Sequence, residues 1–296
     1  GEIAYLCDIL MPTHGLVTNI GTEHLEFFKS IDGVAAEEGA LFGYLSGSKD
    51  SVAFVNSDDR WVSAKARAVC RRITYGFSSR TADVAGRSVR LNATGCARFQ
   101  FQSKTIKKGM PVQLAIPGRH QAANALAAVT IGLTSRVPSR DICRAVEEFR
   151  PASKRMEVLD LDGILVLNDT YNANPDSMIA ALRTLASAKV PGKRIAVLGD
   201  MLELGEVETD EHARVGKEVS RLNIEYLLTY GQRAKHIGIG AKIRFAVHYD
   251  QKNILAEYLA ELLSPGDAVL VKGSRGMKME DVVTFLVERL HKNVAT

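Results

Sequence analysis

The second half of the chain alternates short apolar runs with segments whose apolar residues recur at helical spacing. The runs that predict buried strands are residues 164–167, 195–198, 226–229, 245–247 and 268–271. The helical segments are residues 212–222, 233–239, 254–263 and 278–290. Because strands and helices alternate, we expect a doubly wound, mainly parallel sheet in this half.

The first half has a different order of elements. Helical spacing predicts helices over residues 3–10, 32–45, 61–70 and 139–149, and an Ala-rich helix that begins near residue 119. Asp32 is the expected cap of the second of these helices. Apolar runs predict strands at residues 14–19, 51–55 and 73–76. Between residues 82 and 116, apolar and polar positions alternate around turn residues, which indicates antiparallel hairpins.

Composition argues against several classes of protein. The 296 residues are enough for two domains, and a formal net charge of +4 without a long Lys/Arg block argues against a dedicated nucleic-acid binder. No apolar run approaches the roughly 20 residues that span a bilayer, and no signal peptide is recognisable. The four cysteines lie far apart without C-x-x-C, so they predict neither a disulfide framework nor a Cys-only zinc site. These features predict a cytoplasmic protein.

Residues 168–177, Asn-Asp-Thr-Tyr-Asn-Ala-Asn-Pro-Asp-Ser, join a predicted strand to a predicted helix. Asn174 is a favourable N-cap, and the proline after it suits the first helical position. Capping does not require Asp169, Tyr171 and Asn172, which offer a carboxylate, an aromatic face and an amide within four residues. Loops at the carboxyl ends of strands bind ligands in α/β folds, so this loop is either a ligand contact or a helix cap with polar neighbours.

Two further polar loops follow predicted strands in the same half, at residues 199–205 and 272–276. If these strands are parallel, their carboxyl ends lie on one side of the sheet, and the three loops could line one crevice. Each loop taken alone is also consistent with a simple turn. Neither a G-x-x-x-x-G-K-[ST] phosphate loop nor a G-x-G-x-x-G sequence occurs, so these residues by themselves do not establish nucleotide binding.

Three polar residues of the first half are also candidates. His24 lies in a loop with Glu23 and Glu26 and could join them in a metal site, although a hydrogen-bonded loop histidine is the commoner case. His120 and Asn124 are four residues apart and share one helical face. That face either presents polar groups to a ligand or is the polar start of a core helix.

Six segments, in the same order along the chain, carry a family resemblance. They are residues 18–26 (TNIGTEHLE), 118–124 (GRHQAAN), 154–157 (KRME), 168–175 (NDTYNANP), 198–205 (LGDMLELG) and 272–275 (KGSR). Together they resemble the Mur ligases of peptidoglycan synthesis. The YNANP and GDMLELG segments resemble the branch that adds D-alanyl-D-alanine to the UDP-MurNAc-tripeptide.

The resemblance implies two parts of the family's fold. Residues 1–151 are expected to be the later part of the central ATPase domain, a mixed sheet with antiparallel hairpins, and residues 152–296 a Rossmann-like doubly wound domain. The family's UDP-sugar-binding domain and phosphate loop are expected upstream of Gly1, so we expect this chain alone to be inactive. The implied partners are the UDP-MurNAc-tripeptide and D-alanyl-D-alanine, without nucleic acid or membrane insertion, and a monomer is expected. The implied process is cell-wall biogenesis, which supports cell shape and cell division.

The resemblance also implies an ATP-dependent acid–amino-acid ligase that uses Mg²⁺. ATP phosphorylates a substrate carboxylate and an amine then displaces phosphate, which requires cations around the transferring phosphoryl group. His24 matches the family's magnesium-associated histidine, and His24 and Arg155 are the expected catalytic residues. The expected nucleotide contacts are Asn124 on adenine, Arg155 near the phosphates, Asp169 on the ribose, Tyr171 and His120. The expected substrate contacts are Asn172, Asn174, Ser177, Asp200, Glu203, Ser274 and Arg275.

One position departs from the family. Several Mur ligases carry a lysine, carbamylated in some members, where Glu38 stands here, and Ala40 stands where a Glu is common. A carboxylate at this position either replaces the charge of the carbamate near magnesium or marks lost activity. The alternatives are therefore a non-catalytic nucleotide- or peptide-binding paralogue and a sister amide ligase, either another Mur ligase or folylpolyglutamate synthase.

Overall fold

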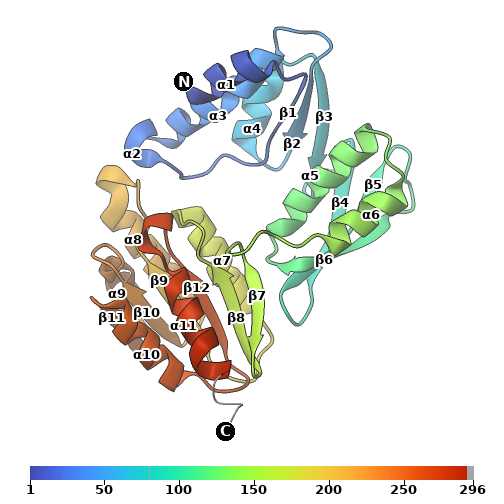
Figure 1. The fold of residues 1–296 in the computed structure, drawn as a ribbon. Helices are drawn as coiled ribbons and strands as arrows, with labels where there is room; N and C mark the ends of the chain where they lie inside the picture. The colour runs from blue at the N-terminus through green and yellow to red at the C-terminus, as the bar shows by residue number, and fades with distance from the viewer. Residues whose placement is uncertain (80, 292–296) are drawn as a thin grey trace. The chain divides into compact units, whose positions relative to one another are not determined.

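The computed structural model describes residues 1–79 and 81–291 and contains two compact units, each built on a six-stranded sheet (Figure 1). The N-terminal unit comprises Gly1–Asn92, Cys96–Ala115 and Arg119–Phe149. The C-terminal unit comprises Ala93–Gly95, Ile116–Gly118 and the chain from Arg150 onward. This α/β architecture with two mixed sheets confirms the fold class expected from the sequence.

The sheet of the N-terminal unit has the strand order β1-β2-β3-β4-β5-β6. Its strands are β1 (His14–Val17), β2 (Val52–Asn56), β3 (Arg71–Gly76), β4 (Val84–Leu91), β5 (Cys96–Ser103) and β6 (Met110–Pro117). Strands β1 to β4 pair in parallel, whereas β4 and β5 form an antiparallel hairpin. The change to alternating positions after residue 82 thus marks a real change from parallel to antiparallel pairing.

The helices of this unit are α1 (Glu2–Leu10), α2 (Leu25–Phe28), α3 (Ile31–Leu45), α4 (Arg60–Lys65), α5 (Gln121–Thr134) and α6 (Ser139–Glu148). The prediction that Asp32 caps α3 is wrong. Ser30 is the N-cap, and its Oγ accepts a hydrogen bond from the Gly33 N–H at 3.2 Å. The hydroxyl of a serine at the cap reaches the N–H three residues further on. Asp32 lies in the first turn of the helix instead, where the positive end of the helix dipole stabilises its negative charge.

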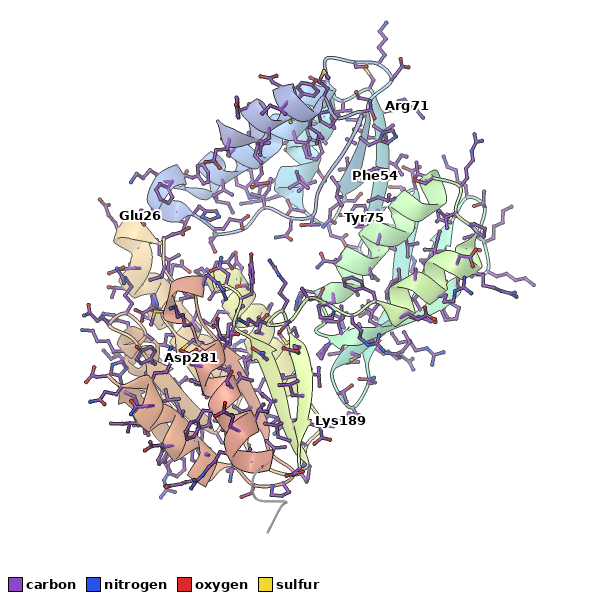
Figure 2. The ribbon with its side chains drawn as sticks, in the orientation of Figure 1. Glu26, Phe54, Arg71, Tyr75, Lys189 and Asp281 are labelled. Atoms are coloured by element: carbon purple, nitrogen blue, oxygen red, sulfur yellow. The ribbon has the colours of Figure 1, made fainter. Side chains whose placement is uncertain are left out.

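One apolar cluster of the N-terminal unit lies between the sheet and α5. Phe54 on β2 and Tyr75 on β3, both labelled in Figure 2, are almost fully buried in one apolar cluster with Leu126 and Val129 of α5. Small side chains such as Ala122 on the same face of α5 let the helix approach the sheet closely. This packing explains why the helix is rich in alanine.

The sheet of the C-terminal unit has the strand order β11-β10-β9-β12-β8-β7. Its strands are β7 (Glu157–Leu161), β8 (Ile164–Asp169), β9 (Arg194–Gly199), β10 (Tyr226–Tyr230), β11 (Phe245–Tyr249) and β12 (Ala268–Lys272). Strands β8 to β12 pair in parallel, and β7 is antiparallel to β8. The apolar pattern did not predict β7, because this strand lies at the sheet edge and its sequence, Glu-Val-Leu-Asp-Leu, interrupts the apolar residues with charged ones.

Helices cover both faces of this sheet. They are α7 (Pro175–Ser187), α8 (Glu208–Arg221), α9 (Lys235–Gly240), α10 (Lys252–Leu262) and α11 (Glu280–His291). Helices α10 and α11 share one apolar core with alternate residues of β8, β9 and β12, on the near side in Figure 1. Helices α7 to α9 pack against one another and against β9, β10 and β12. Every residue of β12 is buried, as expected for a central strand between two helical layers.

None of the helices within residues 1–79 and 81–291 combines the length and the apolar character needed to cross a membrane.

Candidate active site

The carboxyl ends of three neighbouring strands meet at one edge of the C-terminal sheet. Strand β12 pairs in parallel with β8 on one side and with β9 on the other. The loops that follow these strands are residues 170–174, 200–204 and 273–279. The condition that the sequence left open, that these strands are parallel, is therefore met.

Ser274 joins these three loops. It is 3% exposed, and its Oγ accepts a hydrogen bond from the Leu202 N–H at 2.8 Å and donates one to the Ala173 carbonyl at 3.1 Å. Its N–H donates to the Asp200 carbonyl at 2.9 Å. The hydroxyl that the sequence suggested as a substrate contact therefore connects one loop to the other two.

Asp200 also has a role inside the fold. Its carboxylate is buried, and Oδ1 accepts hydrogen bonds from the backbone N–H groups of Arg233 and Ala234 at 3.0 and 2.7 Å. Gly231, with a φ of 109°, passes so close that a Cβ there would lie 2.4 Å from this oxygen. Glu203, the other acidic candidate of this loop, is exposed and has a φ of 63°.

Asn174 and Ser177 form a capping box at the start of α7. Asn174 Oδ1 accepts a hydrogen bond from the Ser177 N–H at 2.8 Å, and Ser177 Oγ accepts one from the Asn174 N–H at 3.0 Å. The predicted N-cap and the proline at the first helical position are both confirmed. The oxygens of both side chains thus bind the helix end, whereas Asn172 in the loop before it is exposed.

Asp169, at the end of β8, connects three segments through its two carboxylate oxygens. Oδ1 accepts a hydrogen bond from the Met156 N–H at 2.9 Å, and Oδ2 forms an ion pair with Lys272 Nζ at 2.6 Å. The same ammonium donates to the Asn172 carbonyl at 2.8 Å. Lys272 is 2% exposed, although sequence reasoning did not select it. The available signal was a lysine at the end of an apolar strand, which the register sets beside Asp169.

Two guanidinium groups lie near the ring of Tyr171. Arg155 Cζ is 3.7 Å from the ring centroid, and Arg275 Cζ is 6.0 Å from it. Both arginines are exposed, and the tyrosine is 43% exposed. A guanidinium at this range is attracted by the electron-rich face of the ring, which holds the charge without neutralising it. The three side chains therefore present positive charge and an aromatic surface to solvent.

Glu280, the first residue of α11, holds two of the cations around this site. Its Oε1 lies 3.0 Å from Lys154 Nζ and 3.0 Å from a guanidinium nitrogen of Arg275. Burial by itself raises the pKa of Glu280, but its own helix N–H, Lys154 and Arg275 outweigh burial and hold the pKa below the usual value. Sequence reasoning missed Glu280, because it is the first-turn acidic residue expected of any helix.

His212, on α8, is a second buried residue that the sequence did not indicate. Its Nε2 accepts a hydrogen bond from the Met201 N–H at 3.0 Å, so its Nδ1 carries the proton and donates to the Glu208 carbonyl at 2.6 Å. Burial lowers the pKa of His212. This imidazole holds the loop after β9 at Met201, the residue next to the one that Ser274 binds.

The remaining candidates belong to the N-terminal unit. His24 is the exposed N-cap residue of α2, with a φ of 52°. Glu38 is half-buried on α3; burial and Glu37 raise its pKa, whereas His24 lowers it. Within residues 1–79 and 81–291, no group of three or more His, Cys, Asp or Glu side chains is arranged to hold a metal ion. A magnesium ion at His24 therefore needs further ligands, such as phosphate oxygens of a nucleotide.

His120 and Asn124 lie at the amino end of α5, as predicted. His120 is exposed at the N-cap position, and Asn124 is exposed one turn later. The Asn124 Nδ2 donates a hydrogen bond to Gln121 Oε1 at 3.1 Å. These two residues do not belong to the unit that contains Arg155, Asp169 and Tyr171.

Two family models match the chain. The Mur ligase middle domain matches residues 1–132, and the glutamate ligase domain of the Mur ligases matches residues 154–275. The UDP-N-acetylmuramoyl-tripeptide--D-alanyl-D-alanine ligase of Bacillus subtilis (strain 168) is 32% identical over 293 residues, which are 97% of this chain and 62% of that protein. The enzyme of the same name from Escherichia coli (strain K12) is 32% identical over 97% of this chain and 63% of its own length.

Solved structures show the same similarity. MurF from Acinetobacter baumannii superposes with a TM-score of 0.86 at 28% identity, over 97% of this chain and 62% of that one. MurF from Thermotoga maritima, solved in complex with ADP, has a TM-score of 0.87 at 23% identity and shares the fold over 99% of this chain. This chain thus spans a little over three-fifths of the length of the curated relatives it matches.

Proposed function

This chain belongs to the Mur ligase family and contains its middle and C-terminal domains. We propose that it forms these two domains of a ligase that joins D-alanyl-D-alanine to the UDP-MurNAc-tripeptide. The observation that carries this proposal is the group of Arg155, Asp169, Tyr171 and Arg275 at one edge of the C-terminal sheet. These residues combine two cations, a carboxylate and an accessible ring, which suit a nucleotide and an anionic peptide end.

Arg155, Asp169 and Tyr171 are the proposed nucleotide contacts. The guanidinium of Arg155 binds phosphate oxygens, and the Tyr171 ring beneath it keeps that charge in place. Asp169 binds the ribose hydroxyls. Each of its oxygens already accepts one hydrogen bond from the protein, and a carboxylate oxygen has a second lone pair for a hydroxyl donor.

Arg275 is the proposed contact for the carboxylate of the incoming dipeptide. One nitrogen of its guanidinium binds Glu280, which leaves the rest of the planar fork for a second, bidentate carboxylate partner. Asn172, exposed in the neighbouring loop, is the proposed polar contact beside it. Asn174, Ser177, Asp200 and Ser274 are proposed to act at this site mainly by ordering the loops, and Glu203 is proposed to contact the substrate.

The proposed reaction has two steps. The carboxylate of the tripeptide attacks the γ-phosphorus of ATP, so that an O–P bond forms, the bond to the β-phosphate oxygen breaks, and ADP leaves. The amine of D-alanyl-D-alanine then attacks the acyl carbon; the C–N bond forms, the C–O bond to phosphate breaks, and the amine loses a proton. Arg155 offsets the negative charge that develops on the transferring phosphoryl group.

Magnesium is proposed as the partner of ATP, and His24 is the proposed residue of this chain near it. The ion supplies charge neutralisation for the phosphates when bound. Asn124 is proposed to bind adenine through its amide, which both donates and accepts hydrogen bonds, and His120 is proposed as its neighbour at the nucleotide.

The test is an amine-acceptor panel with the complete gene product that contains this sequence. UDP-MurNAc-tripeptide, a shorter UDP-MurNAc-peptide or a folate is supplied with ATP, Mg²⁺ and one amine, which is D-alanyl-D-alanine, glutamate or a diamino acid. ADP and the ligated product are measured. We expect product with D-alanyl-D-alanine only. Product with a single amino acid, or with a folate and glutamate, identifies a sister ligase instead. Absence of product and of ADP with every acceptor supports the non-catalytic paralogue, for which Glu38 is the motivating residue.

A further inference from the structure

Lys272 is buried at the end of a strand that is otherwise entirely apolar. Strand β12 reads Ala-Val-Leu-Val-Lys, and the lysine is 2% exposed. A buried ammonium group is costly unless it is paired and hydrogen-bonded. Lys272 meets both conditions, through Asp169 Oδ2 at 2.6 Å and the Asn172 carbonyl at 2.8 Å. A hydrophobic residue would continue the strand pattern, so the charge has a use other than packing.

The ion pair continues into the segment that carries Arg155. Asp169 Oδ1 accepts a hydrogen bond from the Met156 N–H at 2.9 Å, and the Tyr171 N–H donates to the Lys154 carbonyl at 3.0 Å. These two bonds attach the residues on either side of Arg155 to the last residue of β8 and to the loop that follows it. The loop in turn is held by the Lys272 ammonium through the Asn172 carbonyl.

The backbone around Arg155 requires such support. Lys154 has a φ of 69° and Met156 a φ of 52°, so both neighbours of Arg155 adopt the left-handed conformation that non-glycine residues disfavour. Residues in this conformation persist when the surrounding structure holds them in place. Arg155 is thus presented by a strained turn, with its guanidinium 3.7 Å from the Tyr171 ring.

We propose that Lys272 is a positioning residue that acts through Asp169 and the Asn172 carbonyl to hold the strained turn, and with it Arg155, in the geometry that binds the phosphates. This inference rests on the proposed function, in which Arg155 contacts the nucleotide. Lys272 itself is too buried to be the contact. Its ammonium group compensates the negative charge of Asp169. The two Asp169 oxygens can then bind the Met156 N–H of the turn and the end of β12 at the same time.

The chain contains a matched control at the opposite end of the same sheet. Lys193 Nζ forms an ion pair with Asp267 Oδ2 at 3.1 Å and donates to the Leu262 carbonyl at 2.8 Å, so it has the same kinds of partner as Lys272. Its side chain is less buried, 31% exposed against 3% for Lys272, so the control matches the partners and not the burial. Asp267 lies just before β12, whereas Lys272 ends this strand. Replacing Lys193 removes a similar ion pair far along the strand from the loops.

The experiment compares Lys272→Met, Lys272→Arg and Lys193→Met in the complete gene product. Steady-state ligation gives kcat and KM for ATP, and thermal unfolding gives Tm. We expect Lys272→Met to lower kcat/KM for ATP by roughly 10- to 100-fold, because small displacements of a positioned group have effects of this size. Lys193→Met is expected to lower Tm with kcat/KM within about twofold of wild type.

A double-mutant cycle separates positioning from general destabilisation. In an Arg155→Met background, Lys272→Met is expected to add little further loss of kcat/KM, because residues that act through one group are not additive. An equal, additive loss in both backgrounds, or an equal loss in Lys193→Met, overturns the proposal.

Lys272→Arg covers the case in which Lys272→Met does not fold. It keeps the positive charge but replaces a point charge with a planar fork, so we expect a folded protein with kcat/KM between those of wild type and Lys272→Met. A lowered Tm in Lys272→Arg with wild-type kcat/KM for ATP shows that a disturbed ion pair does not affect Arg155 and overturns the proposal. Absence of ligation by the wild-type protein refutes the proposed function but does not test the positioning role of Lys272. That role is then tested by the Tm of the same variants and by their affinity for ATP.

Discussion

At the scale of single residues, the candidate site separates side chains that face solvent from side chains that hold the loops. Arg155, Tyr171 and Arg275 are exposed and interact through the tyrosine ring. Asp200 and Ser274 are buried and bind backbone groups of neighbouring loops. Both kinds occur in the same short signature segments, so the residue type alone does not distinguish a ligand contact from a loop support.

His212 gives a prediction for the pH dependence of stability. Burial lowers the pKa of His212 in the folded protein, so the unfolded chain binds the proton first as the pH falls. The contribution of His212 to stability is therefore fully present above the pKa of the unfolded chain, about 6.5. It is lost as the pH falls from there toward the lower pKa of the folded protein, by at most about 1.4 kcal/mol per pH unit. Urea unfolding between about pH 7.5 and pH 5.5 measures this slope.

The matched variants for this prediction are His212→Gln and His248→Gln. We expect His212→Gln to be less stable at neutral pH, because the bond from Met201 is disturbed, and to show a smaller decrease in stability between the two pH values. His248 is exposed on β11, and its replacement is expected to keep the wild-type slope more closely. An unchanged slope in His212→Gln shows that carboxyl groups, rather than this imidazole, set the pH dependence in that range.

At the scale of elements, the start of α7 fixes the position of the loop that precedes it. The helix begins at Pro175 because Asn174 and Ser177 satisfy each other's backbone N–H groups. Asp176 in the first turn also pairs with Arg214 of α8 at 3.0 Å. The loop of residues 170–174 is thus held at one end by β8 and at the other by a well-capped helix.

The cap yields a prediction for Asn174. Asn174→Ala is expected to lower the free energy of unfolding by about 1 kcal/mol, because the N–H of Ser177 loses its acceptor. Asn174→Asp keeps an acceptor at the cap and is expected to stay close to wild type. Thermal or urea unfolding measures both. Equal stability of the Ala and Asp variants contradicts the capping role. A stable Asn174→Asp with reduced ligation points to a further use of the amide.

At the scale of the whole molecule, the sheet order of the C-terminal unit creates the candidate site. Strands β8, β9 and β12 are far apart in sequence, yet β12 lies between the other two. The loops after all three strands therefore begin at one edge. Residues 103 positions apart in the chain, such as Asp169 and Lys272, thereby become direct neighbours.

Nucleotide binding is expected to stabilise the protein. A ligand that binds only the folded state adds roughly 2.7 kcal/mol to the free energy of unfolding at a concentration 100 times its Kd. For the complete gene product we expect ATP with Mg²⁺ to raise Tm, and ATP with EDTA to raise it less, because the proposed site uses the ion with the phosphates. Guanosine triphosphate is the control for recognition of the base. A Tm that does not change with ATP and Mg²⁺ contradicts the proposed nucleotide site.

The sequence determined most of the segments that form strands and helices, and the family to which the chain belongs. The apolar runs at residues 164–167 and 268–271 became β8 and β12, because short runs of this kind are buried between helical layers. The predicted cap at Asn174 was confirmed for a similarly local reason, since it depends on residues three positions apart. The six ordered segments also identified the family before any contact was known.

Only the tertiary structure decided which polar residues of the candidate site bind neighbouring loops and which are exposed to solvent. The Lys272–Asp169 ion pair depends on strand register, and the bonds of Ser274 depend on strand order; a single sequence contains neither directly. Strand β7 and the cap at Ser30 were misjudged because an edge strand lacks an apolar run and because neighbouring serine and aspartate residues compete for one capping position. Propensity and spacing act over a few residues, whereas the site depends on contacts between residues far apart in the chain.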